Sequence, residues 1–455
     1  MSSQSSQAIT RELARFVAET TYADLPQAVI DRMKVYVLDV LAAGCVGARL
    51  PWADIVYDMV REEGGRPEST VFGRSERVSG LQAALLNGVM IGGFESEHVG
   101  HVSHPAGTVS PAALAVAERQ HASGAEFLLA MAMGYEVVCR IGDGQTGAVE
   151  IERGFHNPAA NGAFSAAAAA GKLFGLSEIE MARAFGVAGS HCGGLTEYAW
   201  DGSMTKRLHL GLAARGGLQS AILAAKGFTG PMTIVEGRYG YLHAFSPSPK
   251  PEVILAGLGE EWRLETLMIK AYPCHVSCQG VVGAIQQLKR TRAIDPREIK
   301  SVHMRSGRSF EERFLNPAPT NALGAQYSVP FTMAVAFFRD LDDPLQYDDS
   351  VLGDPEVETL AGKFSWEPDP AADNPASAKL QIVTATESVD IELNAFRGSP
   401  ANPATFDDAA DKFRRYSRHI VAGSDQDKIV SLVQGLEAVD DVSALTGLLR
   451  PSNNS

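Results

Sequence analysis

The chain has 455 residues, of which 45% are hydrophobic and 21% are charged, and its formal net charge is −14. This length exceeds what one compact core usually holds and predicts two domains, and the composition is that of a soluble globular protein. The negative charge argues against nucleic acids and anionic membranes as partners. Any site for a small anion must therefore be a local basic pocket.

The N-terminal sequence carries no recognisable targeting signal. MSSQSSQAITRELARF lacks the basic-then-apolar order of a signal peptide and the Arg-rich composition of a transit peptide. Lys172 interrupts the Ala-rich run of the chain before it could span a bilayer. The five cysteines are an odd number and form no CxxC pair, which favours reduced thiols. We therefore expect a cytoplasmic protein.

The N-terminal third of the chain has its apolar residues at helical spacing, without alternating strands. The pattern predicts a pair of helices, the second starting near Pro26, within residues 10–50, and further helices in residues 52–63, 79–92, 110–118 and 123–141.

Between two of these helices lies a stretch with many polar residues and glycines, which includes Glu97, His98, His101 and His104. Three histidines at a spacing of three invite a metal-site interpretation. Helical zinc sites prefer a spacing of four, however, and Pro105 indicates a loop. We favour acid–base or substrate-binding roles for these residues over a metal site.

The central stretch, residues 154–227, holds the apolar middle of the chain. An Ala-rich helix is expected over residues 161–174, with Gly175 as its left-handed C-terminal cap. Ser177 stands three residues before Glu180, and this spacing predicts a capping box that opens a second helix. A third helix is expected from Thr205, as N-cap, to residue 226.

Polar residues gather at the ends of these central helices. His156 precedes the Ala-rich run, and Lys206 and His209 lie one turn apart at the start of the third helix. A cation in the first turn opposes the helix dipole, so Lys206 is either solvated or waiting for an anion.

The sequence changes character near residue 262. Residues 299–307 and 378–396 alternate apolar and polar side chains as strands do, whereas residues 326–338 are helical in pattern. Helical patterns return in residues 409–416 and 425–449. The sequence predicts a mainly α fold: a discontinuous all-helical domain of residues 1–265, completed by 400–455, with a smaller α/β lid domain of residues 266–399 inserted.

Two motifs of the second domain carry chemistry. In KAYPCHVSCQ, Lys270 and His275 are separated by a turn stiffened by proline and could serve as charge clamp and proton carrier. In GAQYSVPF, the phenol of Tyr327 opens a helix.

Together these motifs resemble the MmgE/PrpD family over nearly the whole chain. The resemblance is carried by HPAG at His104, GFHNP at His156, GSMTKRLHLG around Lys206, KAYPCH at Lys270, QYSVPF at Tyr327 and GSPANP at Gly398. It implies a helical domain with a smaller α/β lid, a cleft between them, a homodimer, and chemistry on small carboxylic acids without metal or organic cofactor.

The resemblance also implies which residues line the cleft: His104, His156, Lys206, Lys270, His275 and Tyr327. From the chemistry of the residues themselves we assign the following roles. His104 would be the base, with His156 and Tyr327 as proton donors and His275 as a further catalytic candidate. Lys206 and Lys270 would bind substrate carboxylates. The substrate-binding set would be completed by Glu97, His98 and His209.

Three functions remain open at this point. The first is a lyase, a dehydratase or decarboxylase of a small di- or tricarboxylate. The second is an epimerase or isomerase of an amino- or imino-dicarboxylate such as iminodisuccinate, because FESEH at residues 94–98 replaces the Asp-rich motif, close to DFDDT, of family members that act on tricarboxylates. The third is a metabolite-binding protein without catalysis.

Overall fold

The computed structural model describes residues 8–307, 310, 312–370 and 377–451. The chain divides into two compact units. The first comprises Met1–Tyr198, Met204–Leu267 and Thr405–Ser455, and the second comprises Ala199–Ser203 and Met268–Ala404. We call them the helical unit and the α/β unit. The fold is mainly α, as predicted from the sequence.

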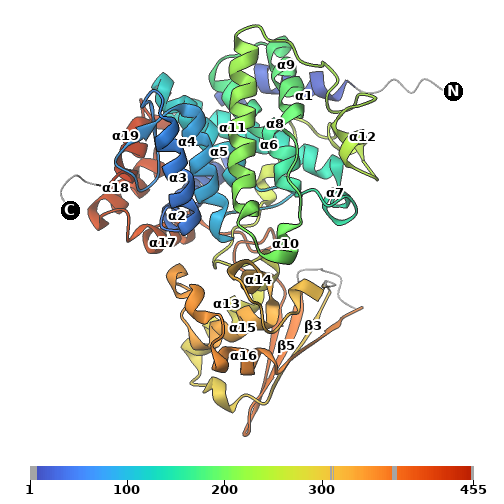
Figure 1. The fold of residues 1–455 in the computed structure, drawn as a ribbon, viewed down its shortest axis with the longest axis vertical. Coiled ribbons are helices and arrows are strands. Elements are labelled where there is room, and N and C mark those ends of the chain that lie inside the picture. Colours follow the sequence, from blue (N-terminus) through green and yellow to red (C-terminus); the bar gives the residue numbers. More distant parts are fainter. Residues whose placement is uncertain (1–7, 308–309, 311, 371–376, 452–455) are drawn as a thin grey trace, which may run out of the picture. The chain divides into compact units, whose positions relative to one another are not determined.

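The helical unit consists almost entirely of helices (Figure 1), with one short antiparallel pair of strands, β1 (Ser69–Thr70) and β2 (Arg77–Val78). Its helices are α1 (Ile9–Glu19), α2 (Gln27–Gly47), α3 (Pro51–Glu63), α4 (Gly80–Ile91), α5 (Pro105–Gln120), α6 (Gly124–Gln145), α7 (Ala148–Ile151), α8 (Asn157–Leu173), α9 (Glu178–Ala188), α11 (Thr205–Ala225), α12 (Tyr241–Phe245), α17 (Phe406–Ser417), α18 (Gly423–Gln434) and α19 (Ser443–Thr446). The boundary between the units falls within α10 (Tyr198–Asp201).

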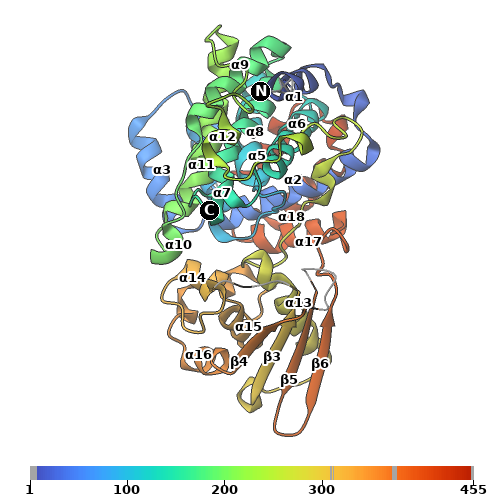
Figure 2. The ribbon, with the colours of Figure 1, turned by 90° about the vertical axis from the view of Figure 1, so that its right-hand side faces the viewer.

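The Ala-rich helix α8 is the centre of the helical unit (Figure 2) and packs against α5, α6 and α11. All of its residues from Asn157 to Gly171 are buried. Small side chains allow this close packing: a Cβ atom on Gly217 of α11 would lie only 2.4 Å from the carbonyl oxygen of Ala163. The Ala-rich composition therefore allows the central helices to approach at backbone distance.

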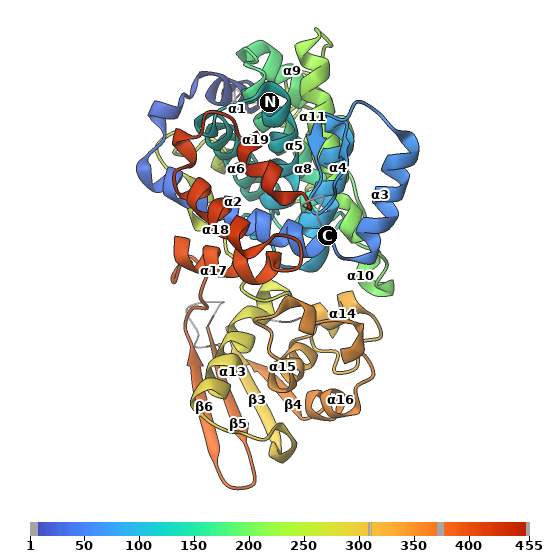
Figure 3. The same cartoon turned by 90° about the vertical axis from the view of Figure 1, so that its left-hand side faces the viewer.

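The C-terminal helices belong to the helical unit, where α17 packs along α2 (Figure 3). Phe413 and Tyr416 bury one face of α17. On the same helix, the Lys412 ammonium lies 2.6 Å from the Asp39 carboxylate of α2, and both side chains are buried. An ion pair between residues so distant in sequence fixes the end of the chain against its beginning.

The α/β unit is built on a four-stranded sheet in the order β4-β3-β5-β6. Its strands are β3 (Ser301–Ser306), β4 (Phe364–Pro368), β5 (Ala378–Val383) and β6 (Ser388–Leu393), and its helices are α13 (Gln279–Thr291), α14 (Ala322–Tyr327), α15 (Val329–Phe338) and α16 (Pro355–Ala361). β3 runs parallel to β4 and antiparallel to β5, and β5 is antiparallel to β6. In β3 and β5, Val302 pairs with Ile382 and Met304 with Leu380, and all four side chains are buried. The alternation in the sequence thus marks the buried face of this sheet.

Most element predictions are confirmed, with local differences. The predicted helix at residues 110–118 begins earlier, at Pro105, because proline is well suited to a first helical turn. Thr205 is the first residue of α11 and Met204 holds the N-cap position, so the predicted N-cap at Thr205 is wrong. Among the described residues, no helix combines the length and apolar character needed to cross a membrane.

Candidate active site

The three closely spaced histidines of the FESEHVGHVSHP segment contact different partners and share none. His98 contacts Asp39 and Tyr135, whereas His101 contacts Asp143. His104 contacts Glu97. The described residues contain no group of three or more His, Cys, Asp or Glu side chains that could hold a metal ion.

His98 lies in the core of the helical unit. Its Nδ1 is 2.8 Å from Asp39 Oδ2, its Nε2 is 2.8 Å from the Tyr135 hydroxyl, and its side chain has 0% exposure. Burial lowers the pKa of His98 below its usual value, which favours the neutral ring. Because both ring nitrogens are hydrogen bonded inside the protein, the geometry favours a structural role over the predicted contact with substrate.

His104 and Glu97 form a carboxylate–imidazole pair. Glu97 Oε1 lies 2.6 Å from His104 Nδ1, with Glu97 buried and the His104 side chain 19% exposed. An ionised carboxylate can only accept, so Nδ1 carries the proton in this pair and Nε2 of a neutral ring is left as a base. His104 immediately precedes α5, whose first residue is Pro105, and this position fixes the backbone of the histidine.

His156 and His209 form a second pair. Their Nδ1 atoms are 3.1 Å apart, and the ring centroids of His104 and His156 are 6.0 Å apart. Burial lowers the pKa of His156 well below its usual value, and the neighbouring rings of His104 and His209 lower it further. Burial and the Lys206 ammonium lower the pKa of His209 to about 4. Both rings are therefore neutral near pH 7, and one Nδ1–H donates to the other Nδ1.

The loop before α10 fixes these rings. The carbonyl of Gly194 accepts a hydrogen bond from the His156 amide at 2.9 Å. Gly194 has φ +85°, and a Cβ there would lie 2.6 Å from the Ala159 Cβ and 3.2 Å from the His209 ring. Only glycine fits this conformation and this approach. Tyr198, which the sequence analysis did not identify, packs edge-on against His156 and His209 with centroids 5.4 and 5.7 Å away.

Lys206 already has an anionic partner. Its ammonium forms an ion pair with the Glu95 carboxylate, and both side chains are at most 3% exposed. The next residue, Arg207, donates to the carbonyl of Gly93, and its guanidinium lies 3.9 Å from the ring centroid of Trp52. The anion expected opposite Lys206 is thus supplied at least in part by the protein, which weakens the prediction that this lysine is a free clamp for substrate.

The α/β unit brings His275 and Tyr327 together. Their ring centroids are 4.6 Å apart, and Phe314 stacks on Tyr327 at 5.6 Å. The His275 amide donates to the carbonyl of Gln326, which ties the two motifs through the backbone. Tyr327 is the last residue of the short helix α14, and the next helix, α15, begins at Val329. The prediction that Tyr327 opens a helix is therefore wrong.

Lys270 lies just before these residues in the chain and is buried, with 1% exposure. The turn that follows it is held by one side chain: Gln279 accepts from the amides of Ala271 and Tyr272 and donates to the carbonyls of Tyr272 and Cys274. The backbone that carries Lys270 is thereby fixed.

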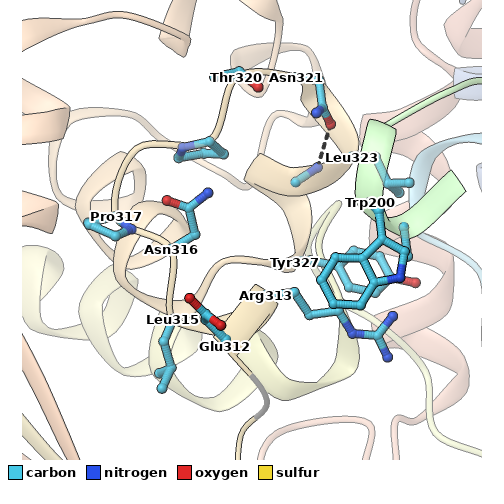
Figure 4. Close-up of a pocket in the computed structure, with 13 residues that line it drawn as sticks. Trp200, Glu312, Arg313, Leu315, Asn316, Pro317, Thr320, Asn321, Leu323 and Tyr327 are labelled. Atoms are coloured by element: carbon cyan, nitrogen blue, oxygen red, sulfur yellow. Dashed lines mark hydrogen bonds between the residues drawn. The ribbon is translucent and has the colours of Figure 1, made fainter. Parts of the chain in front are cut away.

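A pocket of about 670 Å³ lies beside Tyr327 within the α/β unit (Figure 4). Its lining includes the indole of Trp200, the Arg313 side chain, and Asn321, which caps α14 by accepting from the Gly324 amide at 2.8 Å. The Arg313 guanidinium carbon is 6.0 Å from the Tyr327 ring centroid. The pocket thus combines apolar walls with the cation of Arg313, the carboxylate of Glu312 and side-chain amides, a combination that suits a small polar organic molecule.

Comparison with known proteins supports the family that the motifs indicated. The model of the MmgE/PrpD N-terminal domain matches residues 11–254, and the model of the MmgE/PrpD C-terminal domain matches residues 272–438. A cis-aconitate decarboxylase-like protein of Aspergillus oryzae is 29% identical over 97% of both chains. The cis-aconitate decarboxylase of Aspergillus terreus is 29% identical over 97% of this chain and 96% of its own. That of Homo sapiens is 28% identical over 97% of this chain and 94% of its own.

The two matched domains follow one another in the order of the family and cover most of the chain, and the relatives that span nearly its whole length are named as decarboxylases. The chain is therefore a lyase-type enzyme that belongs to the MmgE/PrpD family.

Proposed function

We propose that this enzyme is a cofactor-independent lyase of a small di- or tricarboxylic acid, with decarboxylation as its first candidate reaction and His104 as the proton carrier. The observation that carries the proposal is the Glu97–His104 pair at 2.6 Å, in which a buried carboxylate supports a partly exposed imidazole. The names of the relatives favour decarboxylation over the other outcomes.

The Glu97 carboxylate holds the His104 ring in one orientation, with a proton on Nδ1 and with Nε2 available for proton transfer. In a decarboxylation, the bond between carbon and the departing carboxylate breaks, and its electron pair stays on the carbon as CO₂ leaves. That carbon then takes the proton of the His104 imidazolium. In a dehydration, Nε2 of the neutral His104 ring would take a proton from carbon, and the hydroxyl group would leave as water with a proton donated by a second group.

One ring of the His156–His209 pair is proposed to act as a neutral hydrogen-bond donor to a substrate carboxylate. The ring whose Nδ1 accepts carries its proton on Nε2 and can donate it, whereas the ring that donates through Nδ1–H has no second N–H. Their lowered pKa values disfavour imidazolium ions near pH 7. In place of the predicted proton transfer from His156, the pair would therefore polarise the substrate carboxylate through the one Nε2–H that it has free of the Nδ1–Nδ1 contact. In the α/β unit, Lys270 is proposed to bind a carboxylate and Tyr327 to donate to the leaving group, with His275 as its neighbour.

Epimerisation of an amino- or imino-dicarboxylate stays the alternative. The observation that favours it is the FESEH segment, in which Glu95 pairs with Lys206 and Glu97 pairs with His104. Lys206 is thus paired with a carboxylate of the protein, which disfavours it as a clamp for a third substrate carboxylate. An epimerase would use the same first step, removal of a proton beside a carboxylate.

The test is proton NMR of the protein in D₂O with cis-aconitate and a panel of small di- and tricarboxylates. A decarboxylase converts a substrate to a product with one carboxylate fewer, and an epimerase exchanges a C–H for deuterium without loss of carbon. His104→Gln and Glu97→Gln should each lower turnover or exchange by about 10²- to 10⁴-fold. His121→Gln is the matched control, because His121 also contacts a carboxylate, Asp441 at 2.8 Å, but on the surface. Wild-type turnover in both active-site variants would disprove the role of the pair.

A further inference from the structure

The backbone around Glu97 is held by charged side chains that the proposed chemistry does not use. Lys412 of α17 donates to the carbonyl of Ser96, the residue between the two acids of the FESEH segment. Asp39 of α2 accepts from the backbone amide of His98 at 2.9 Å, on the other side of Glu97. Both neighbours of Glu97 in the chain are thus fixed by side chains from other helices.

Lys412 and Asp39 also bind each other. The Lys412 ammonium lies 2.6 Å from Asp39 Oδ1, whereas Asp39 Oδ2 accepts from both the amide and the ring of His98. The chain of contacts ends at the Tyr135 hydroxyl, which lies 2.8 Å from His98 Nε2. All four side chains of this network, Lys412, Asp39, His98 and Tyr135, are at most 3% exposed.

The Asp39 carboxylate of this network is held in its ionised form. Burial raises the pKa of Asp39, but the Lys412 ammonium and the hydrogen bonds of His98 lower it, and the net pKa lies below its usual range. A buried ion pair adds little net stability compared with apolar residues of the same volume, and such pairs are retained in some proteins because they fix a geometry. Here the geometry that they fix is the backbone on both sides of Glu97.

We propose that Lys412 and Asp39 are positioning residues that hold the Ser96–His98 backbone so that the Glu97 carboxylate stays aimed at Nδ1 of His104. The inference rests on the proposed function of the Glu97–His104 pair. It assigns to the C-terminal helix α17 a part in catalysis without contact with substrate: Lys412 acts through Ser96 and Asp39, and Asp39 acts through His98.

The first experiment measures kcat and KM of Lys412→Met and Asp39→Asn for the substrate found in the NMR panel, or the rate of deuterium exchange. Displacement of the carboxylate by about 1 Å should lower kcat by roughly 10- to 100-fold with KM changed less than about threefold. Lys412→Arg keeps the charge and should recover part of the loss. Because removal of one charge from a buried pair can unfold a protein, Asp39→Asn/Lys412→Met, which removes both charges, is tested in parallel.

Lys34→Met is the matched control. Lys34 is also a buried lysine that joins α2 to the C-terminal segment, through Glu437 at 2.7 Å and the carbonyl of Gln434 at 2.9 Å, and neither hydrogen bond involves the FESEH segment. Lys34→Met should lower the melting temperature and leave kcat unchanged. A loss of kcat in Lys34→Met equal to that in Lys412→Met would mean that general destabilisation, and not positioning, causes both.

A double-mutant cycle with Glu97→Gln separates the inference from the proposed function. If Lys412 acts through Glu97, Lys412→Met should change kcat less than about threefold in the Glu97→Gln background. Full additivity of the two losses would overturn the inference while leaving the catalytic pair in place. Wild-type activity of Glu97→Gln alone would overturn the proposed function itself.

Discussion

Lys206 illustrates how the environment of one residue changes its interpretation. In the sequence, a cation in the first turn of a helix indicates a group that is either solvated or waiting for an anion. In the structure, the side chain is buried and its ammonium pairs with Glu95, a residue 111 positions earlier in the chain. Glu95 itself has a left-handed backbone, with φ 54°, so the loop is shaped to bring the carboxylate to this lysine.

The buried pair predicts a stability defect for Lys206→Ala. The variant leaves the Glu95 carboxylate buried without the Lys206 ammonium, which should lower the free energy of unfolding by about 3 to 5 kcal/mol. Glu95→Gln/Lys206→Ala removes both charges and should recover part of that loss. Urea unfolding followed by circular dichroism measures both variants. An unchanged unfolding midpoint for the single variant would show that the pair is not needed for stability.

The lowered pKa of His209 predicts how the free energy of unfolding depends on pH. The folded-state pKa of about 4 lies below the usual 6.5, so between these values the unfolded chain binds more protons than the folded protein. Stability from this group is fully present above pH 6.5 and is lost as the pH falls to 4. The pKa difference sets an upper limit of roughly 3 kcal/mol for this loss, before screening by solvent.

His209→Gln should therefore flatten the decline of unfolding free energy between pH 6.5 and 4, as measured by urea unfolding at several pH values. His121→Gln, at an exposed site, should follow the wild-type slope. Identical slopes for His209→Gln and the wild type would contradict the prediction.

At the scale of elements, local signals in the sequence were sufficient where the element depends on neighbouring residues. Ser177 and Glu180 form the predicted capping box of α9, and Gly175 has the expected positive φ of 66°. Strand β4 was not predicted, because its five residues alternate poorly and its pairing partner, β3, lies about 60 positions earlier in the chain. Pairing with a distant strand, and not local pattern, makes this segment a strand.

The same distinction applies to the candidate site. The sequence identified Glu97 and His104 as candidates for the site. It also predicted that His156 and His209 lie near the starts of helices. It could not show that these side chains meet in pairs, because no spacing rule relates a loop residue to a residue in the second turn of a helix. Lys412 and Asp39 are 373 residues apart, so nothing local connects them.

At the scale of the whole molecule, the helical unit is assembled from three separate segments of the chain. The last segment, α17 to α19, covers α2 and supplies buried contacts to the first: Lys412 to Asp39 at 2.6 Å, and the Thr446 hydroxyl to Glu118 at 2.6 Å. The N-terminal segments alone would leave these two buried carboxylates without those partners.

Truncation after Ala404 should therefore abolish cooperative unfolding of the helical unit. The shortened chain exposes the face of α2 against which α17 packs, and it loses the Lys412 ammonium from the Asp39 carboxylate. Thermal unfolding by circular dichroism should give a broad transition at a lower temperature, with most of the protein insoluble on expression. Supplying residues 405–455 as a separate chain during expression should restore part of the soluble protein, because the lost contacts are noncovalent. A truncated chain that unfolds cooperatively at the full-length midpoint would show that the helical unit is complete without its last segment.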